Sequence, residues 1–143
     1  MTKQEYQHIR NLAWDLLIDS NTSSLPVNIL AIANIYGLER LVDNNKSLYE
    51  NTLSISDGIL KVFGLNTELS MYLAVRILAP MIVLNELNVK SAKEISDLSG
   101  LPFDIATQRY DRLLMLQKRN AFEVSRLESI VLSQFKEWIS RSC

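Results

Sequence analysis

Histidine and cysteine, the side chains most often used to bind metals and to activate nucleophiles, each occur once in the chain, as His8 and Cys143. A zinc site needs three or four Cys, His or carboxylate ligands, and an HExxH helix needs two histidines one turn apart. His8 is expected off the apolar stripe of the first helix, and Cys143 is far from it in sequence, so no thiol or serine nucleophile gains a well-placed base. We therefore expect no catalytic residue, no metal site and no cofactor.

Carboxylate pairs remain as candidates for acid–base chemistry, because hydrolysis needs only two such groups. Asp15 and Asp19 are one helical turn apart, while Asp43, Glu50 and Asp57 fall in expected loops. Such spacing is typical of a solvated helix face, and no GK[ST] pattern of a phosphate-binding loop occurs. An enzyme with metal-free chemistry is therefore one functional alternative. Carboxylates clustered in a cleft would favour it.

The composition limits the class of protein. A chain of 143 residues and 16.3 kDa suits one domain, and 48% hydrophobic with 22% charged residues is typical of soluble globular proteins. A net charge of -1 excludes a generally basic surface for nucleic acid but leaves room for a local basic face. The single cysteine favours a reducing compartment, the apolar residues 72–84 are too few to span a bilayer, and residues 1–20 lack a signal-peptide pattern. These features predict a cytoplasmic protein.

Capping residues and apolar spacing predict that most of the chain is helical. Three capping boxes begin helices: Thr2 with Glu5, Ser91 with Glu94, and Ser125 with Glu128. Pro26 is expected near the first position of a second helix that ends at Gly37, and Pro80 is expected to interrupt a later one. The expected helices cover residues 2–20, 26–37, 66–78, 81–87, 91–100, 102–120 and 125 onward.

One region has a different pattern. Residues 53–63, LSISDGILKVF, alternate around Asp57-Gly58, and Asp-Gly between alternating runs is the strongest short-range signal of a β-hairpin. We expect a small antiparallel sheet of two to three strands after the second helix. The expected fold class is α+β, a mostly helical single domain.

Residues 91–120 have the spacing of a helix-turn-helix, with Gly100 where the turn needs a positive φ. The outward residues of its second helix would be Phe103, Asp104, Thr107, Gln108 and Asp111. The candidate DNA contacts are Gln108, Arg109 and Arg112, but two aspartates on the same face have the wrong sign for phosphates. Two helices that pack through a tight turn would give the same pattern.

A family resemblance begins at residues 73–80. Their sequence, LAVRILAP, resembles the F-A-x-x-L-L-x-P helix of the ImmA/IrrE family of zinc metallopeptidases. Residues 25–37 begin with LPV and end in glycine, as the family's corresponding segment does, and Asp57-Gly58 falls where its hairpin turns. Residues 83–101 resemble the family's helix-turn-helix-like region, and residues 119–135 resemble the C-terminal helix of members from Gram-positive bacteria. The resemblance covers nearly the whole chain and implies one ImmA/IrrE-like domain over residues 1–143.

The chain departs from this family at the active site. Active members place an HExxH helix between the hairpin and the F-A-x-x-L-L-x-P helix, with an acidic third ligand just before the latter. Only fourteen residues separate Gly58 from Leu73, and HExxH does not occur. The family's acidic positions fall on Thr67 and Leu69, and the intervening Glu68 alone cannot hold zinc. The resemblance thus implies that the active-site helix is deleted outright and that the chain is not an enzyme.

Two functional hypotheses follow. Active family members act on, or lie beside, helix-turn-helix repressors of mobile elements and stress regulons, so the resemblance implies a bacterial regulator that binds a protein such as one of these repressors. The expected hairpin and the exposed part of the last helix are candidate surfaces. The alternative is a DNA-binding regulator that uses residues 91–118. A membrane partner is not expected, and homodimerisation is open because Phe135 and Trp138 suit either a core or an interface.

Overall fold

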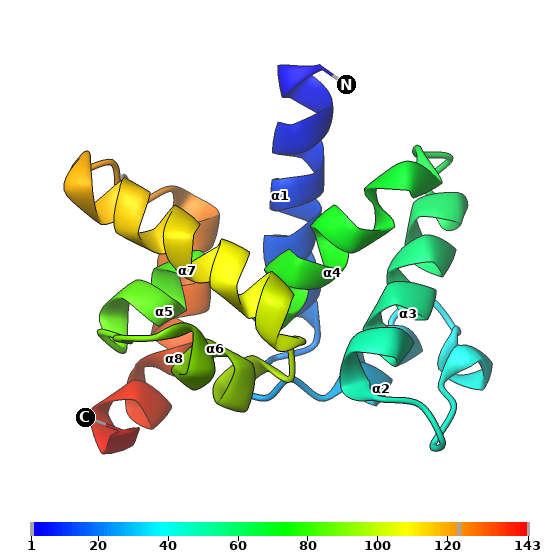
Figure 1. Cartoon of the computed structure of the whole chain (residues 1–143). Coiled ribbons are helices and arrows are strands. Elements are labelled where there is room, and N and C mark those ends of the chain that lie inside the picture. The colour runs from blue at the N-terminus through cyan, green and yellow to red at the C-terminus, as the bar shows by residue number, and fades with distance from the viewer. Residues whose placement is uncertain (1, 123, 143) are drawn as a thin grey trace.

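The computed structural model describes residues 2–122 and 124–142, and every regular element in them is a helix (Figure 1). In chain order the elements are α1 (Lys3–Asp19), α2 (Ile29–Asn34), the 3-10 helix η1 (Glu39–Leu41), α3 (Leu48–Val62), the 3-10 helix η2 (Thr67–Leu69), α4 (Ser70–Leu78), α5 (Met81–Glu86), α6 (Ala92–Ser99), α7 (Phe103–Lys118) and α8 (Arg126–Ser142). The expected α+β class is wrong, because these residues contain no antiparallel sheet and no strand.

The region expected to form the hairpin is helix α3. The Ser47 hydroxyl accepts a hydrogen bond from the Glu50 amide, and the Glu50 carboxylate accepts one from the Ser47 amide, which begins the helix. Ile55 and Ile59, one turn apart, are both fully buried in the core. A short apolar run suits either a helix or a strand, and here packing against α4 selects the helix.

Gly58 serves close packing rather than a turn. A Cβ atom at this position would lie 3.1 Å from the Cδ1 atoms of both Leu38 and Leu41, so glycine lets the η1 segment approach α3 closely. Its neighbour Asp57 forms an ion pair with Lys61 at 2.8 Å, a contact that the i,i+4 spacing of a helix provides. Tertiary packing therefore explains Gly58, whereas Asp57 is explained by an ion pair within the helix.

Most expected helix boundaries are confirmed. Both hydrogen bonds of the capping boxes at Thr2 and Ser125 are present, and Pro80 separates α4 from α5. The predicted start of the second helix was wrong. Asn28 caps it by accepting hydrogen bonds from two backbone amides, so α2 begins three residues after Pro26.

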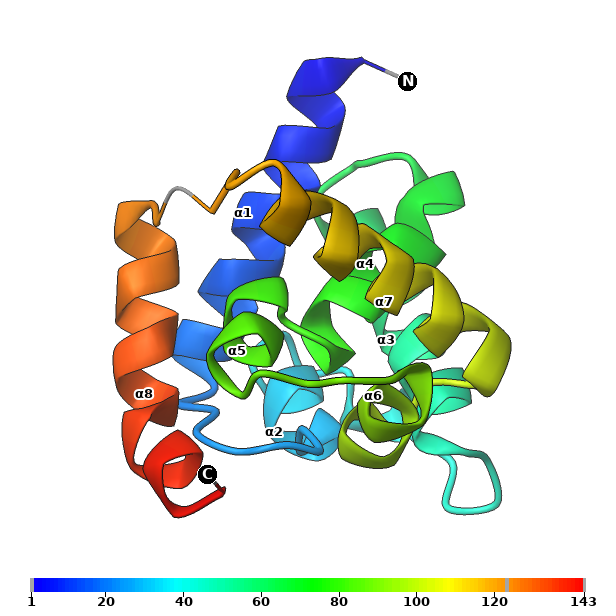
Figure 2. The same cartoon turned by 60° about the vertical axis from the view of Figure 1, so that its left-hand side comes forward.

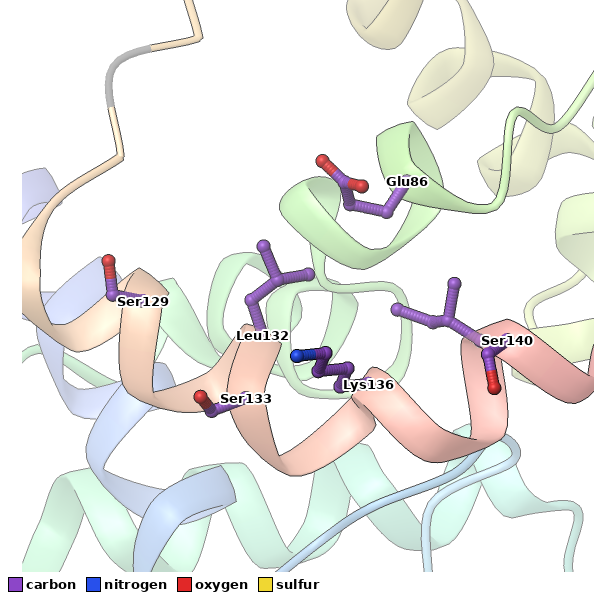
Figure 3. A pocket seen from close by; sticks show the side chains of 7 residues that line it. Glu86, Ser129, Leu132, Ser133, Lys136 and Ser140 are labelled. Atoms are coloured by element: carbon purple, nitrogen blue, oxygen red, sulfur yellow. The ribbon is translucent and has the colours of Figure 1, made fainter.

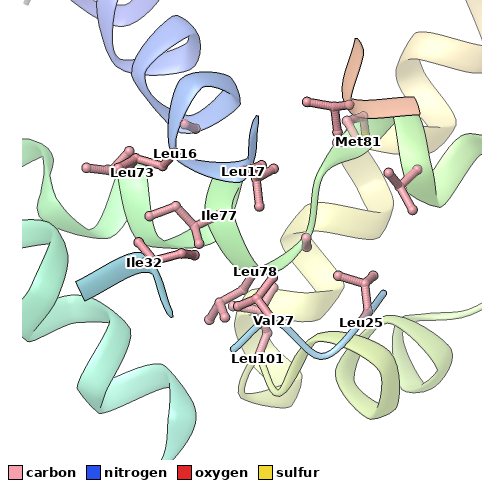
Figure 4. Close-up of a cluster of buried hydrophobic side chains, with 14 of the residues drawn as sticks. Leu16, Leu17, Leu25, Val27, Ile32, Leu73, Ile77, Leu78, Met81 and Leu101 are labelled. Atoms are coloured by element: carbon pink, nitrogen blue, oxygen red, sulfur yellow. The ribbon is translucent and has the colours of Figure 1, made fainter. Parts of the chain in front are cut away.

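Helix α4 lies at the centre of the molecule, with α1 and α3 packed against it (Figure 1). Figure 4 shows Leu73, Ile77 and Leu78 of α4 among Leu16 and Leu17 of α1, and all five side chains are fully buried. Burying each such side chain stabilises the fold by roughly 1.5–3 kcal/mol. Helix α8 runs beside α1, and α5 contacts both α8 and α7 (Figure 2).

The segment Thr67–Glu86 is long and apolar enough, by length and composition, to cross a membrane. It contains η2, α4 and α5, which are interrupted at Ala79-Pro80, and most of it is buried inside the protein. Its apolar character is therefore explained by its place in the core.

Candidate functional site

Four arginines from three helices line one cavity of about 480 Å³. Arg10 comes from α1, Arg76 from α4, and Arg109 and Arg112 from α7. A neighbouring pocket of about 350 Å³ shares the last three of these arginines and also includes Glu68. Cationic side chains far apart in the sequence are thus brought together where α1, α4 and α7 meet.

Arg109 is buried at the end of α4, with a relative exposure of 7%. Its Nε and Nη2 atoms donate hydrogen bonds to the Ala79 carbonyl oxygen at 3.0 and 2.8 Å. This carbonyl directly follows α4, where backbone oxygens lack partners within the helix. Burial, reinforced by the charge of Arg76, lowers the pKa of Arg109 to about 9, so the guanidinium stays charged at neutral pH.

Arg76 is held by the aromatic residue one turn before it. Its Cζ atom lies 3.3 Å from the centroid of the Tyr72 ring, and its Nη1 atom donates a hydrogen bond to the Tyr72 carbonyl oxygen at 3.3 Å. The Tyr72 ring is in turn packed edge-on against Tyr6. The pKa of Arg76 is lowered to about 10, mainly by burial and to a smaller extent by the charges of Arg10 and Arg112, against the opposing effect of Tyr72.

Among the described residues, none of these four arginines forms an ion pair; the pairs found there are Lys61–Asp57, Lys93–Asp97 and Arg141–Glu137. Glu128 also lines the cavity, but its Oε1 atom accepts a hydrogen bond from the Ser125 amide at the start of α8. The cavity therefore carries an excess of positive charge, and chemically it is suited to an anion.

The segment expected to be a helix-turn-helix consists of α6, a turn and α7. Gly100 has a φ of +79° in the turn, as expected for a position that favours glycine. Of the candidate DNA contacts, Gln108 and Arg112 are exposed. Arg109 is not accessible to DNA, because its guanidinium is buried against Ala79. The sequence pattern did not separate inward-facing from outward-facing cations on this helix.

A separate depression of about 420 Å³ lies between α5 and α8. Figure 3 shows Glu86 of α5 across the opening from Leu132 and Lys136 of α8. Three serines of α8 and Ile139 complete its lining. This groove combines half-buried aliphatic side chains with small polar ones.

In residues 2–122 and 124–142, no three His, Cys, Asp or Glu side chains are close enough to hold a metal ion. His8 is exposed on α1, and Cys143 lies outside the described residues. Asp15 and Asp19 are exposed, and burial together with the Asp19 charge raises the pKa of Asp15. No cleft lined by several carboxylates occurs among the described pockets.

Sequence reasoning missed Arg10 and Arg76 as site residues. A signal for Arg76 was present, because it is the one charged residue in the apolar stretch 72–84. Nothing local marks Arg10, which becomes part of the site only through the packing of α1 against α4.

The chain matches no known protein-family model, and it resembles neither a curated protein nor a solved structure at a significant level.

Proposed function

We propose that this chain is a non-catalytic relative of the ImmA/IrrE metallopeptidases that acts in the bacterial cytoplasm by binding another protein, in the regulation of a mobile element or a stress response. The observation that carries the proposal is the position and composition of α3. This helix directly precedes η2 and α4, as the HExxH helix precedes the F-A-x-x-L-L-x-P helix in the family.

We place residues 55–59, ISDGI, at the position of the family's HExxH run, because α3 precedes α4 in the same order. In this placement Ile55 and Ile59 stand for the two histidines and Ser56 for the glutamate, while Thr67 and Leu69 stand at the acidic positions. The three aliphatic side chains are buried in the one hydrophobic core. This part of our proposal differs from the outright deletion expected from the sequence, which stays a prediction: here the helix is kept, and aliphatic core residues stand where the ligands would be.

Aliphatic side chains supply no electron pair to a metal ion, so a protein of this kind acts through its surface. The partner that the resemblance favours is a helix-turn-helix repressor. The groove between α5 and α8 is the candidate binding surface, because Leu132 and Ile139 provide apolar contacts beside small serine side chains.

Affinity capture from nuclease-treated lysate of the native organism tests this proposal. Three forms are compared: the wild type, a groove variant with Leu132→Ser and Ile139→Ser, and the control Ile130→Ser, which alters an exposed residue of α8 outside the groove. We expect the wild type and the control to retain one helix-turn-helix protein that the groove variant loses. Equal capture by all three forms, or no captured protein, contradicts the proposal.

Metal analysis tests the non-catalytic part separately. Because no metal contributes to folding in this proposal, a chelator and added zinc should both leave the melting temperature unchanged. Stoichiometric zinc in the purified protein, or stabilisation by zinc, contradicts it.

A DNA-binding regulator is the second candidate, favoured by the left-handed Gly100 between α6 and α7. Its candidate contacts are now Gln108 and Arg112, and exposed Asp104 and Asp111 oppose phosphate binding from the same helix. If this candidate is correct, duplex DNA binding should weaken steeply with salt and be lost on combining Gln108→Ala with Arg112→Ala. Absent or salt-insensitive binding rejects it.

A further inference from the structure

The cavity between α1, α4 and α7 has no place in the proposed protein-binding function. Its four guanidinium groups donate their hydrogen bonds, among the described residues, only to neutral acceptors. Arg10 donates to the Gln7 side chain, Arg76 to the Tyr72 carbonyl, Arg109 to the Ala79 carbonyl, and Arg112 contacts the Met115 sulfur. We propose that this cavity binds a small phosphorylated molecule with an aromatic ring, in the manner of a nucleotide. The proposal is independent of the protein-binding proposal.

The charges that line the cavity favour a bound anion. Buried or partly buried cations are normally paired, because removing a charge from water without a partner is costly. Here the arginines instead lie close enough to repel one another: after burial, the charge of Arg76 lowers the pKa of Arg109, and the charge of Arg112 lowers the pKa of both. A bound phosphate with two negative charges would offset this repulsion.

The guanidinium groups of Arg76 and Arg109 are already held in place by other contacts. Arg109 is more than nine-tenths buried, and two of its nitrogens are fixed on the Ala79 carbonyl, while Nη1 has no hydrogen-bond partner among the described residues. Arg76 is fixed by its contact with the Tyr72 ring. Fixed, planar guanidinium groups lose little entropy on binding and match the oxygen spacing of a phosphate.

The size of the cavity and its aromatic lining suit a small molecule with a flat ring. A volume of about 480 Å³ lies within the usual range of small-molecule sites, roughly 300–1,000 Å³. Trp14 and Phe122 also line the cavity, so an aromatic ring of the ligand has two flat partners beside the arginines. A phosphate joined to a flat ring fits this lining better than an isolated anion does.

Calorimetric titration of the full chain at low and physiological salt tests the proposal with four probes: ADP, pyrophosphate, adenosine and a short DNA duplex. We expect ADP to bind most tightly, pyrophosphate more weakly, and adenosine not at all at millimolar concentration. ADP should also raise the melting temperature.

Two variants that keep the buried contacts intact localise the binding. Arg112→Gln and Arg10→Gln change cavity residues from two different helices, and Arg119→Gln removes the same charge from an exposed residue just beyond α7. Each cavity variant should weaken ADP binding by about tenfold or more, and Arg119→Gln by less than about twofold.

Four outcomes would overturn the proposal. These are no binding of ADP or pyrophosphate, equal losses in Arg112→Gln and Arg119→Gln, adenosine binding as tightly as ADP, or duplex DNA binding more tightly than ADP with the same dependence on Arg112. Equal binding of ADP and pyrophosphate would overturn the role of Trp14 and Phe122.

Discussion

Two buried serines differ in whether their hydroxyl groups have hydrogen-bond partners. The Ser56 hydroxyl has none among the described residues, whereas the Ser99 hydroxyl donates to the Ile95 carbonyl and accepts from the Leu101 amide. An unpaired buried hydroxyl is destabilising, and its loss removes that cost. Ser56→Ala should therefore raise the free energy of unfolding by about 1 kcal/mol, and Ser99→Ala should lower it by about 1–2 kcal/mol. Urea denaturation measures both, and a destabilised Ser56→Ala variant would contradict this account.

The raised pKa of Asp15 predicts that the stability of the protein depends on pH. Burial, and secondly the Asp19 charge, raise its pKa in the folded state above the ordinary value of 3.8. The folded protein thus binds this proton more tightly than the unfolded chain, and the resulting stability is lost as the pH rises through the folded-state pKa. Asp15→Asn should stabilise the protein at neutral pH, by less than about 1 kcal/mol because the side chain is exposed. The gain should shrink below pH 3.8 in thermal unfolding; a gain independent of pH would point to packing instead.

At the scale of the element, local sequence signals predicted where helices begin better than they predicted whether a segment is a helix or a strand. The capping boxes at Thr2 and Ser125 act over three residues, so the sequence contains the whole interaction. The prediction of a hairpin was wrong because a glycine is needed at position 58 for close contact with Leu38 and Leu41, which lie about twenty residues earlier in the chain. In a fifteen-residue helix whose buried face depends on α4, tertiary packing outweighs the turn preference of Asp-Gly.

Gly64 and Gly100 both have a positive φ, but only Gly100 is crowded by a neighbouring side chain. Substitutions at these two positions therefore allow backbone strain to be compared with steric crowding. Gly64, after α3, has a φ of +67° and open space where a Cβ would lie, whereas Gly100 has a φ of +79° and Leu48 Cδ2 only 3.0 Å from that position. Gly64→Ala should cost about 1–2 kcal/mol from the backbone alone. Gly100→Ala should cost more in chemical denaturation, because Leu48 must also move. Equal losses would show that α3 does not pack firmly against the turn between α6 and α7.

At the scale of the whole molecule, the arginine cavity explains why the candidate site escaped prediction. Its four cations lie in three helices, and each helix alone has an ordinary composition. Arg109 was selected as a DNA contact because the sequence places it on a helix but does not show that this side chain faces Ala79. Only the crossing of α1, α4 and α7 turns scattered charges into one site.

A side chain of α8 joins this helix to the beginning of the chain. The Gln134 side-chain amide donates to the Leu17 and Thr22 carbonyl oxygens at 3.0 and 2.9 Å, a contact between residues more than 100 positions apart. Gln134→Ala leaves the Thr22 oxygen without this donor and should lower the free energy of unfolding of the whole domain by about 1–2 kcal/mol.

The matched control is Gln117→Ala, which removes an exposed hydrogen bond between α7 and α5 and should change stability by less than about 0.5 kcal/mol. Because α8 also packs on α5, the loss in Gln134→Ala should appear as one shifted, cooperative transition by circular dichroism and by tryptophan fluorescence. Trp14 lies on α1 and Trp138 on α8, so both ends of the chain contribute to the fluorescence signal. Separate transitions in the two signals would mean that α8 unfolds independently, and the cavity would then be held by α1, α4 and α7 alone.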